Sequence, residues 1–306
     1  MKHKQWTVLL FSVCLLINVP LLADNTSPAV TSELPFSAGE TLHYTLSYQG
    51  LLTSMLQADI ADAKMTFLAN RQTPNNENGY QFVLQLSTEN YTKAELIQPV
   101  RYIYTTTLDE TLQRTLLVEE VDNGENQSHD FLWLDWQNKE TQLFKKREKE
   151  LLSSDLFGLK KKEVWEKDGE QKVPEFLNNF PLLENNQSYL IHKESGDKIK
   201  RRKILDPLSM IYMLRTFDFS SKKEVAIAVS DDIRLYRIEK TGIETLKVGK
   251  NNYQTTRYKI HTDEKKDKSF YVWLNNDKHK IPLRFMMQAP LGRLEVDLIS
   301  FSDGWK

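Results

Sequence analysis

Apolar and polar residues alternate with a period of two along most of the chain, which is typical of strands that bury one face. In residues 41–50, TLHYTLSYQG, one face would carry Leu42, Tyr44, Leu46 and Tyr48. The same alternation recurs in residues 80–88, 101–108, 111–121, 130–136, 141–147, 224–231, 233–240, 244–249, 253–262, 269–275, 281–289 and 292–301. The pattern therefore predicts a long succession of short strands.

Turn-forming residues separate these strands. A polar hairpin loop is expected at residues 70–79, and shorter turns at SDD (230–232), KTG (240–242), NNDK (275–278) and APLG (289–292). Short strands joined by hairpin turns favour antiparallel pairing. The sequence predicts a mainly β protein with a strongly curved antiparallel sheet, either a β-roll or an open barrel-like sheet.

Residues 151–205 interrupt this pattern, because Lys, Glu and Asn are abundant there and no period is sustained. We interpret them as a mixed polar connection with one short helix near residues 151–159. Residues 36–306 then form a single β-rich domain, long enough to bury a substantial core. A domain boundary within residues 151–205 is the alternative.

The most apolar and least strand-like stretch after the N-terminus is ILDPLSMIYMLRTFDF. Asp206 is a favourable N-cap and Pro207 suits the first helical position, so a buried helix of about a dozen residues is predicted to begin here. Apolar residues surround it on all sides, which indicates a helix enclosed by protein and too short to cross a bilayer. An arginine on such a helix is usually paired, and Glu40 or Glu244 is the predicted partner of Arg215.

A basic run, KIKRRK (198–203), precedes this helix. Such a run either binds anionic lipid or phosphate or is simply solvated. We favour the solvated interpretation.

The N-terminus has the organisation of an export signal: a basic start, the apolar core WTVLLFSVCLLINV, and Ala23 as a small residue for cleavage. We predict a cleavable signal peptide at residues 1–23, a flexible segment at residues 24–35, and the periplasm as the destination. An uncleaved membrane anchor is the alternative, which the short apolar run disfavours. Val13 before Cys14 argues against a lipoprotein signal.

Composition narrows the function classes further. Cleavage would remove two lysines and no acid, which changes the formal net charge from −1 to −3, so no nucleic-acid partner is expected. It would also remove Cys14, the only cysteine, so the mature chain has no thiol for a disulfide, a metal or a nucleophile.

Catalytic and metal-binding motifs are missing from the sequence. It has no G-x-S-x-G, phosphate loop or H-E-x-x-H motif. The later histidines are too widely spaced for a metal site: His43, His129, His192, His261 and His279. Glu40, Glu244 and Glu295 would serve a hydrolase only if two of them faced one another across a cleft. We expect no metal, no cofactor and no enzymatic activity.

Aromatic residues in the predicted strands either line a concave pocket or pack in the core. They are Tyr44, Tyr48, Trp133, Trp136, Tyr236, Tyr271 and Trp273. We favour core packing for each, although a sheet rolled around one helix would leave room for a groove.

Several motifs resemble a bacterial family of exported proteins called domain of unknown function 3108. They are a GE-x-L-x-Y strand, a D-P-L-S-x-x-Y-x-L-R helix, a strand with G-x-E, and a W…D…P…R hairpin before a strand that begins with glycine. The matching residues are Gly39, Glu40, Leu42 and Tyr44; Asp206, Pro207, Ser209, Tyr212, Leu214 and Arg215; Gly242 and Glu244; Trp273, Asp277, Pro282, Arg284 and Gly292. The resemblance extends over nearly all of the chain after the signal and is weakest over residues 123–203.

This resemblance implies an exported β-rich protein in which the motif residues are structural, but it implies no reaction. The fold-level analogies are the curved sheets of periplasmic lipoprotein carriers and the spiral β-roll of envelope-integrity proteins. We expect a non-enzymatic periplasmic protein of the Gram-negative cell envelope. It would bind an apolar or envelope-derived ligand, or a partner protein, in a groove of the curved sheet, with no transmembrane span in the mature chain.

Two alternatives stay open. One is a periplasmic hydrolase that acts on envelope glycan or ester. The other is an outer-membrane β-barrel, whose strands also alternate. The polar residues 151–205, the enclosed helix and the C-terminal SDGWK argue against the second.

Overall fold

The computed structural model describes residues 34–50, 58–74, 77–124, 128–148, 173–179, 189–219, 223–230, 232–262, 269–289 and 292–302. The predicted signal peptide at residues 1–23, residues 24–33 of the predicted flexible segment, and the predicted helix near residues 151–159 lie outside the described residues. Leu34, near the end of that segment, packs against the core.

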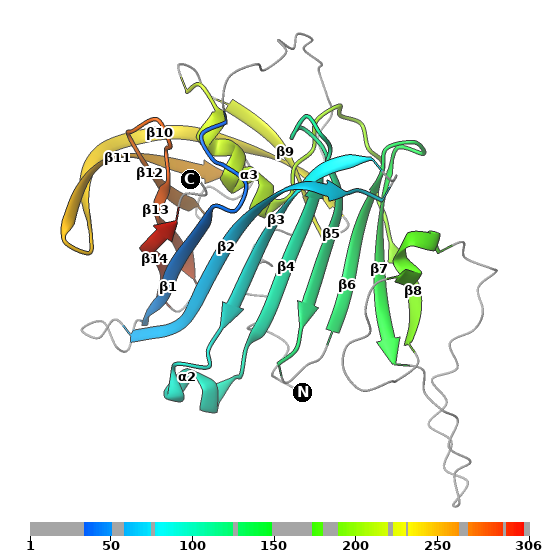
Figure 1. Ribbon diagram of the computed structural model, residues 1–306, viewed down its shortest axis with the longest axis horizontal. Helices are drawn as coiled ribbons and strands as arrows, with labels where there is room; N and C mark the ends of the chain where they lie inside the picture. Colours follow the sequence, from blue (N-terminus) through cyan, green and yellow to red (C-terminus); the bar gives the residue numbers. More distant parts are fainter. Residues whose placement is uncertain are drawn as a thin grey trace, which may run out of the picture.

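Fourteen strands form one antiparallel sheet (Figure 1). They are β1 (Thr41–Gly50), β2 (Ala58–Gln72), β3 (Asn78–Ser87), β4 (Arg101–Leu108), β5 (Thr115–Asp122), β6 (Ser128–Asp135), β7 (Glu140–Glu148), β8 (Tyr189–Ser195), β9 (Lys223–Val229), β10 (Asp232–Val248), β11 (Asn251–His261), β12 (Phe270–Asn275), β13 (Pro282–Ala289) and β14 (Gly292–Ser302). The helices are α2 (Thr92–Ile97) and α3 (Pro207–Met213), with 3-10 turns η2 (Glu175–Asn179) and η3 (Leu214–Thr216). The predicted mainly β class is confirmed.

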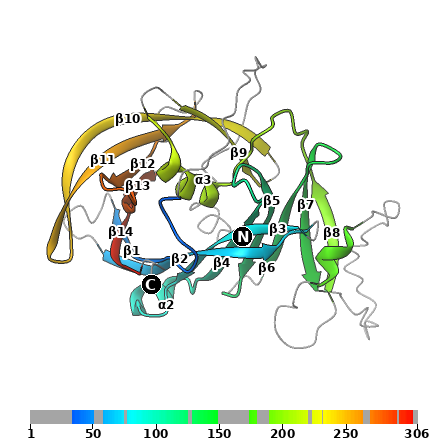
Figure 2. The same cartoon turned by 45° about the horizontal axis from the view of Figure 1, so that its top comes forward.

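The sheet consists of two meanders, β1 to β8 and β9 to β14. They are joined where β1, the first strand of the chain, pairs with β14, the last. From one edge to the other the order is β8-β7-β6-β5-β4-β3-β2-β1-β14-β13-β12-β11-β10-β9. The sheet is therefore open, with β8 and β9 as its edges among the described strands. It curls so that β9, β10 and β11 lie across from β2, β3 and β4 with α3 between them (Figure 2). This is the predicted strongly curved antiparallel sheet.

Helix α3 begins where the sequence predicts, but it is shorter. Asp206 caps it and Pro207 opens it, and η3 continues it for one turn. Leu208, Met210 and Tyr212 are buried, as expected for a helix enclosed by protein. In the described part of the chain, no helix has the length and apolar character that crossing a membrane requires.

The main core lies between α3 and the inner face of the sheet, which is the face that α3 covers. Tyr212 stacks on Phe82 with ring centroids 4.1 Å apart, and Phe36 packs edge-on against Phe67 and Tyr212. A smaller cluster forms on the opposite face around Leu177 of η2. Because the curl is filled by α3 and these aromatic rings, the inner face is core at this point.

Some predicted boundaries were wrong. The KTG turn at residues 240–242 is a bulge inside the continuous strand β10, where Thr241 is the extra residue opposite β11. Strand β2 was not predicted, because alanines at 58, 61 and 63 give little apolar contrast. Strand β8 lies within the predicted polar connection, and α2 lies between the predicted strands at residues 80–88 and 101–108, where no element was predicted.

Candidate functional site

The motif residues of the first strand and the helix meet in one buried ion pair. Arg215 is 1% exposed and Glu40 is 2% exposed. The guanidinium donates to both carboxylate oxygens, at 2.5 and 2.9 Å. It also donates to the carbonyl oxygens of His279 and Pro35, at 2.9 and 2.7 Å. Of the two predicted partners, Glu40 is the one that binds Arg215.

Asp206 holds the start of α3 to the sheet. Its carboxylate accepts hydrogen bonds from the backbone N–H groups of Leu208 and Ser209 and from the hydroxyl groups of Tyr104, Thr106, Thr115 and Ser209. The Ser209 hydroxyl accepts in return from the Asp206 N–H, which completes a capping box. One side chain thus satisfies the helix end and connects it to β4 and β5.

Other motif residues shape the turns around this core. Gly39 has φ +86°, a conformation that other residues rarely adopt, and it lies just before Glu40 in the turn that the hydrogen bond from the Glu40 N–H to the Ser37 carbonyl oxygen closes. The Tyr44 hydroxyl donates to the Pro282 carbonyl oxygen at 3.0 Å. Asp277 accepts from two backbone N–H groups of the β12–β13 turn, which it closes.

Gly292 permits a close approach of β14 to β1. A Cβ atom at this position would lie 2.3 Å from the carbonyl oxygen of Gln49, so a larger residue would push the two strands apart. The pairing of the two meanders therefore depends on a glycine here.

The remaining motif residues lie away from α3, among charged side chains of the strands β10 to β14. Gly242 is the residue after the β10 bulge, opposite Arg257 of β11. Arg284 donates to Asp297 at 2.5 Å, and the Arg257 guanidinium lies 6.0 Å from the Trp273 ring centroid. The pKa of Arg284 is raised, since its hydrogen bond and charge interaction with Asp297 outweigh its burial.

The three candidate hydrolytic carboxylates are each bound by an arginine. Glu40 binds Arg215, Glu244 lies 3.4 Å from Arg257, and Glu295 lies 3.6 Å from Arg284. Glu295 also lies 3.5 Å from Arg293, so each of the three carboxylates is close to at least one arginine.

The described histidines lie in separate places and do not form a cluster. His129 is buried with Nε2 2.6 Å from Glu119, His261 lies 3.8 Å from Glu239, and His43 is exposed. His279 takes part through its carbonyl oxygen, and the side chain of His192 is outside the description. Within the described ranges, no three His, Cys, Asp or Glu residues are grouped so that they could hold a metal ion.

The aromatic residues are mainly core. Tyr44 and Trp273 are buried, Trp133 packs edge-on against Phe176, and Trp136 and Tyr236 pack against the main core. Tyr48 and Tyr271 are half-buried on their strands. Of the seven, Tyr44 alone is among the residues that line the depression described next.

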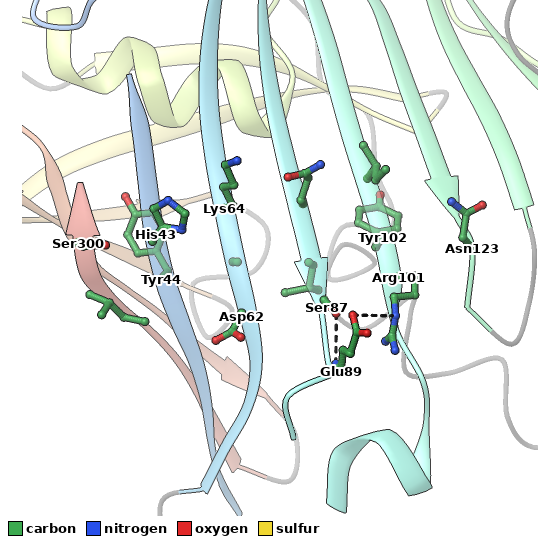
Figure 3. Close-up of a pocket in the computed structure, with 15 residues that line it drawn as sticks. His43, Tyr44, Asp62, Lys64, Ser87, Glu89, Arg101, Tyr102, Asn123 and Ser300 are labelled. Atoms are coloured by element: carbon green, nitrogen blue, oxygen red, sulfur yellow. Dashed lines mark hydrogen bonds and ion pairs between the residues drawn. The ribbon is translucent and has the colours of Figure 1, made fainter. Parts of the chain in front are cut away.

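A shallow depression lies on the outer face of the sheet, which is the face turned away from α3 (Figure 3). We call it the outer-face basin. Its volume is about 810 Å³ and it extends from β14 across β1, β2, β3 and β4. Side chains in register across these strands line it: Ser300, His43, Lys64, Gln85 and Ile103.

The polar groups of this basin fall into two classes. Asp62 is occupied, because it accepts hydrogen bonds from Asn90 at 2.7 Å and Tyr91 at 2.6 Å. Burial, together with this hydrogen bond, raises the pKa of Tyr91 to about 12. Lys64 and His43 are exposed, and neither has a hydrogen-bond or ion-pair partner among the residues that the structure describes. The basin therefore presents the Lys64 ammonium group and the His43 imidazole without a partner among the described residues.

The sequence analysis did not identify one half-buried carboxylate on the inner face. Glu120 of β5 accepts a hydrogen bond from the Tyr102 hydroxyl at 2.7 Å and lies opposite Asp130 of β6. Burial raises the pKa of Glu120 from 4.5 to about 7, with a smaller contribution from the Asp130 charge. In the sequence, Glu120 looks like any polar residue near the end of a strand.

This carboxylate gives a prediction about stability and pH. Between about pH 4.5 and 7 the folded chain holds a proton that the unfolded chain has released, so its contribution to the free energy of unfolding falls as the pH rises. Glu120→Gln should remove this loss and stabilise the protein by about 2 kcal/mol above about pH 7. Urea unfolding across this pH range measures the effect. Glu110→Gln, on an exposed turn, is the control. Parallel curves for Glu120→Gln and the unaltered protein would contradict the prediction.

A family model described as "Protein of unknown function (DUF3108)" matches residues 185–299, so the resemblance is confirmed over that range. The range contains β8, α3, the strands β9 to β13 and most of β14. Gly39, Glu40 and Tyr44 lie outside it, although the structure brings Glu40 into contact with Arg215.

Two solved structures resemble this chain over most of its length. A Brucella abortus "Beta-barrel-like Protein of Domain of Unknown Function DUF1849" has 8% identity and a TM-score of 0.43, and the match covers 88% of this chain and 98% of that one. A "putative lipoprotein" from Parabacteroides distasonis has 6% identity and a TM-score of 0.29, with coverage of 88% and 97%. No curated protein matches the sequence.

Proposed function

We propose that this protein is a non-enzymatic binding protein of the bacterial cell envelope. Its ligand would join an anionic group to an apolar chain and would lie in the outer-face basin. The observation that supports this most directly is the pair of exposed, unpartnered side chains of Lys64 and His43 within the described part of that basin. The predicted signal peptide supports export to the periplasm.

The position of Lys64 suits an anionic group. His43 and Gln85 are its direct neighbours on the adjacent strands, so the three side chains project from the same face within a few ångströms of one another. The Asp62 carboxylate already accepts hydrogen bonds from Asn90 and Tyr91, whereas the Lys64 ammonium group has no ion-pair partner among the described residues and can bind an anionic group.

Apolar side chains lie at both ends of the row that His43, Lys64 and Gln85 form across the strands. Ile103 of β4 follows Gln85 in register, and Ile299 is a 54% exposed residue at the β14 bulge beside Ser300. Both residues line the basin. An amphiphile can therefore place its charged end near Lys64 and its chain against isoleucine.

The proposal differs from the expected location of the ligand. The sequence predicted a groove of the curved sheet, and a sheet rolled around one helix suggested a place for it inside the curl. There, near β1 to β4, α3 and the aromatic core fill the space. The open surface is the opposite one, where the polar residues of the alternating strands meet.

A short-chain phosphatidylglycerol that remains monomeric in solution is the probe for this site. We expect Lys64→Glu to weaken its binding roughly tenfold or more, because the variant replaces an attractive charge with a repulsive one. Isothermal titration calorimetry measures the affinity, and mass spectrometry of natively extracted protein shows whether a lipid copurifies.

Lys247→Glu, an exposed charge reversal on β10, is the matched control and should bind like the unaltered protein. Equal affinity for Lys64→Glu and Lys247→Glu would disprove the site. Turnover of glycan or ester substrates, or crosslinking of a stoichiometric protein partner at the basin, would replace the proposal with the hydrolase or the scaffold alternative.

A further inference from the structure

The net charge of the outer-face basin depends on one histidine. Its charged lining residues are Lys64, Arg101, Asp62 and Glu89. Their formal charges cancel, so the described lining is neutral as long as the His43 imidazole is neutral. Lysine, arginine and carboxylate groups ordinarily keep their charge between about pH 5 and 8, whereas a histidine ordinarily changes its charge in this range. Protonation of His43 therefore gives the lining a net positive charge.

The other ionisable groups of the described lining are two tyrosines, Tyr44 and Tyr102. Burial raises the pKa of each well above its ordinary value, so both hydroxyl groups stay neutral. Glu120 has its pKa raised to about 7, but this half-buried residue lies on the inner face of the sheet, beside the Tyr102 hydroxyl. Of the described residues that line the basin, His43 is thus the one whose charge follows the pH near neutrality.

His43 and Lys64 are placed so that one anionic group can contact both. They are direct neighbours on β1 and β2 and point from the same face of the sheet (Figure 3). Neighbours of this kind have their Cβ atoms about 5 Å apart. Both side chains are exposed, and neither has a hydrogen-bond or ion-pair partner among the residues that the structure describes.

Two carboxylates lie near His43 on the neighbouring strands of the described sheet. Asp62 of β2 accepts hydrogen bonds from neutral donors, which leave its negative charge in place. Asp297 of β14 is paired with Arg284. Both carboxylates attract a protonated His43 and repel an anionic ligand, but their charge stays the same between about pH 5 and 8. The part of the attraction that varies with pH therefore comes from His43.

We infer that protonation of His43 sets how tightly the outer-face basin holds its anionic ligand, so that a fall in pH favours binding and a rise favours release. Lys64 attracts the anion throughout this range, and His43 attracts it only when the imidazole is protonated. Binding of the anion and binding of the proton consequently favour each other by the same factor. This inference rests on the proposed function, since it concerns the same ligand at the same site.

Calorimetry with monomeric phosphatidylglycerol at about pH 5.5 and about pH 8 tests the inference with the full mature chain. The phosphodiester of this probe keeps its charge in that range, so a change of affinity belongs to the protein. We expect the unaltered protein to bind roughly three- to tenfold more tightly at the lower pH. His43→Gln should bind equally at both, and it should fold normally because His43 is exposed.

Proton uptake is a second measurement of the same coupling. Titrations at about pH 6.5 in buffers of different ionisation enthalpy should show that the unaltered protein takes up part of a proton when it binds the probe. His43→Gln should take up none. Absence of proton uptake by the unaltered protein would contradict the inference.

Two control variants separate His43 from other groups that titrate. His279→Gln alters a histidine of the β12–β13 turn, and Glu120→Gln alters the inner face. Both should keep the pH dependence of binding. Equal affinity of the unaltered protein at the two pH values, or an undiminished pH dependence in His43→Gln, would overturn the inference and leave the site defined by Lys64→Glu intact. Absence of binding at both pH values would overturn the proposed function and the inference together.

Discussion

Replacing Arg215 by leucine is expected to lower the free energy of unfolding by about 3–5 kcal/mol, because Glu40 would be left as an uncompensated buried charge. Both side chains are almost fully enclosed, and Arg215 also satisfies the carbonyl oxygens of His279 and Pro35. Urea unfolding followed by tryptophan fluorescence measures the change from the midpoint and slope.

Two controls make this result specific. Arg237→Leu breaks the exposed pair with Glu224 and should cost less than about 1 kcal/mol. Arg215→Leu combined with Glu40→Leu removes both charges and should recover much of the loss, since a buried pair is often replaceable by apolar residues. A single variant as stable as the unaltered protein would show that Arg215 does not hold the N-terminal turn to the helix.

Asp206→Ala is expected to have an effect of similar size, about 3–5 kcal/mol. The helix would lose its cap, and the buried hydroxyl groups of Thr106 and Thr115 would lose their acceptor. Because α3 occupies the centre of the curl, its displacement would also loosen the main core. Thermal unfolding and near-ultraviolet circular dichroism would report the two consequences separately.

The matched control is Asp109→Ala. Asp109 also accepts hydrogen bonds from backbone N–H groups, those of Gln113 and Arg114, but it lies in the turn between β4 and β5. Its loss should cost about 1 kcal/mol. If Asp206→Ala costs no more than Asp109→Ala, Asp206 is only a local cap and does not connect the helix to the sheet.

Local chemistry explains which parts of this fold could be predicted. The start of α3 follows from an N-cap followed by proline, both of which act within a few residues. The partner of Arg215 could be narrowed to two carboxylates because a lone charge among apolar residues requires one. The choice of Glu40 over Glu244 could not be made, since it depends on which strand the curl brings to the helix.

Other features depend on contacts that a strand pattern does not contain. Lys64 and His43 occupy polar positions that look like any solvated strand face, and only the arrangement of four neighbouring strands shows that they lack partners among the described residues. Glu120 is also a polar residue of a strand, but it lies half-buried on the inner face beside Tyr102 and Asp130, and the strand pattern does not show this. The short helix α2, with its exposed Leu96 and Ile97, lies in a connection that has no periodic signal.

The strand order also has a consequence for how the chain is made. Every neighbouring pair in the sheet is consecutive in sequence except β1 with β14. During synthesis β1 appears first, so it keeps one unpaired edge until almost the whole chain has followed, and closing so long a loop is slow. Unpaired edges invite pairing with other chains in this interval. The last of the described strands to be made therefore completes the middle of the sheet, and the edge of β1 stays open to such pairing until β14 has been made.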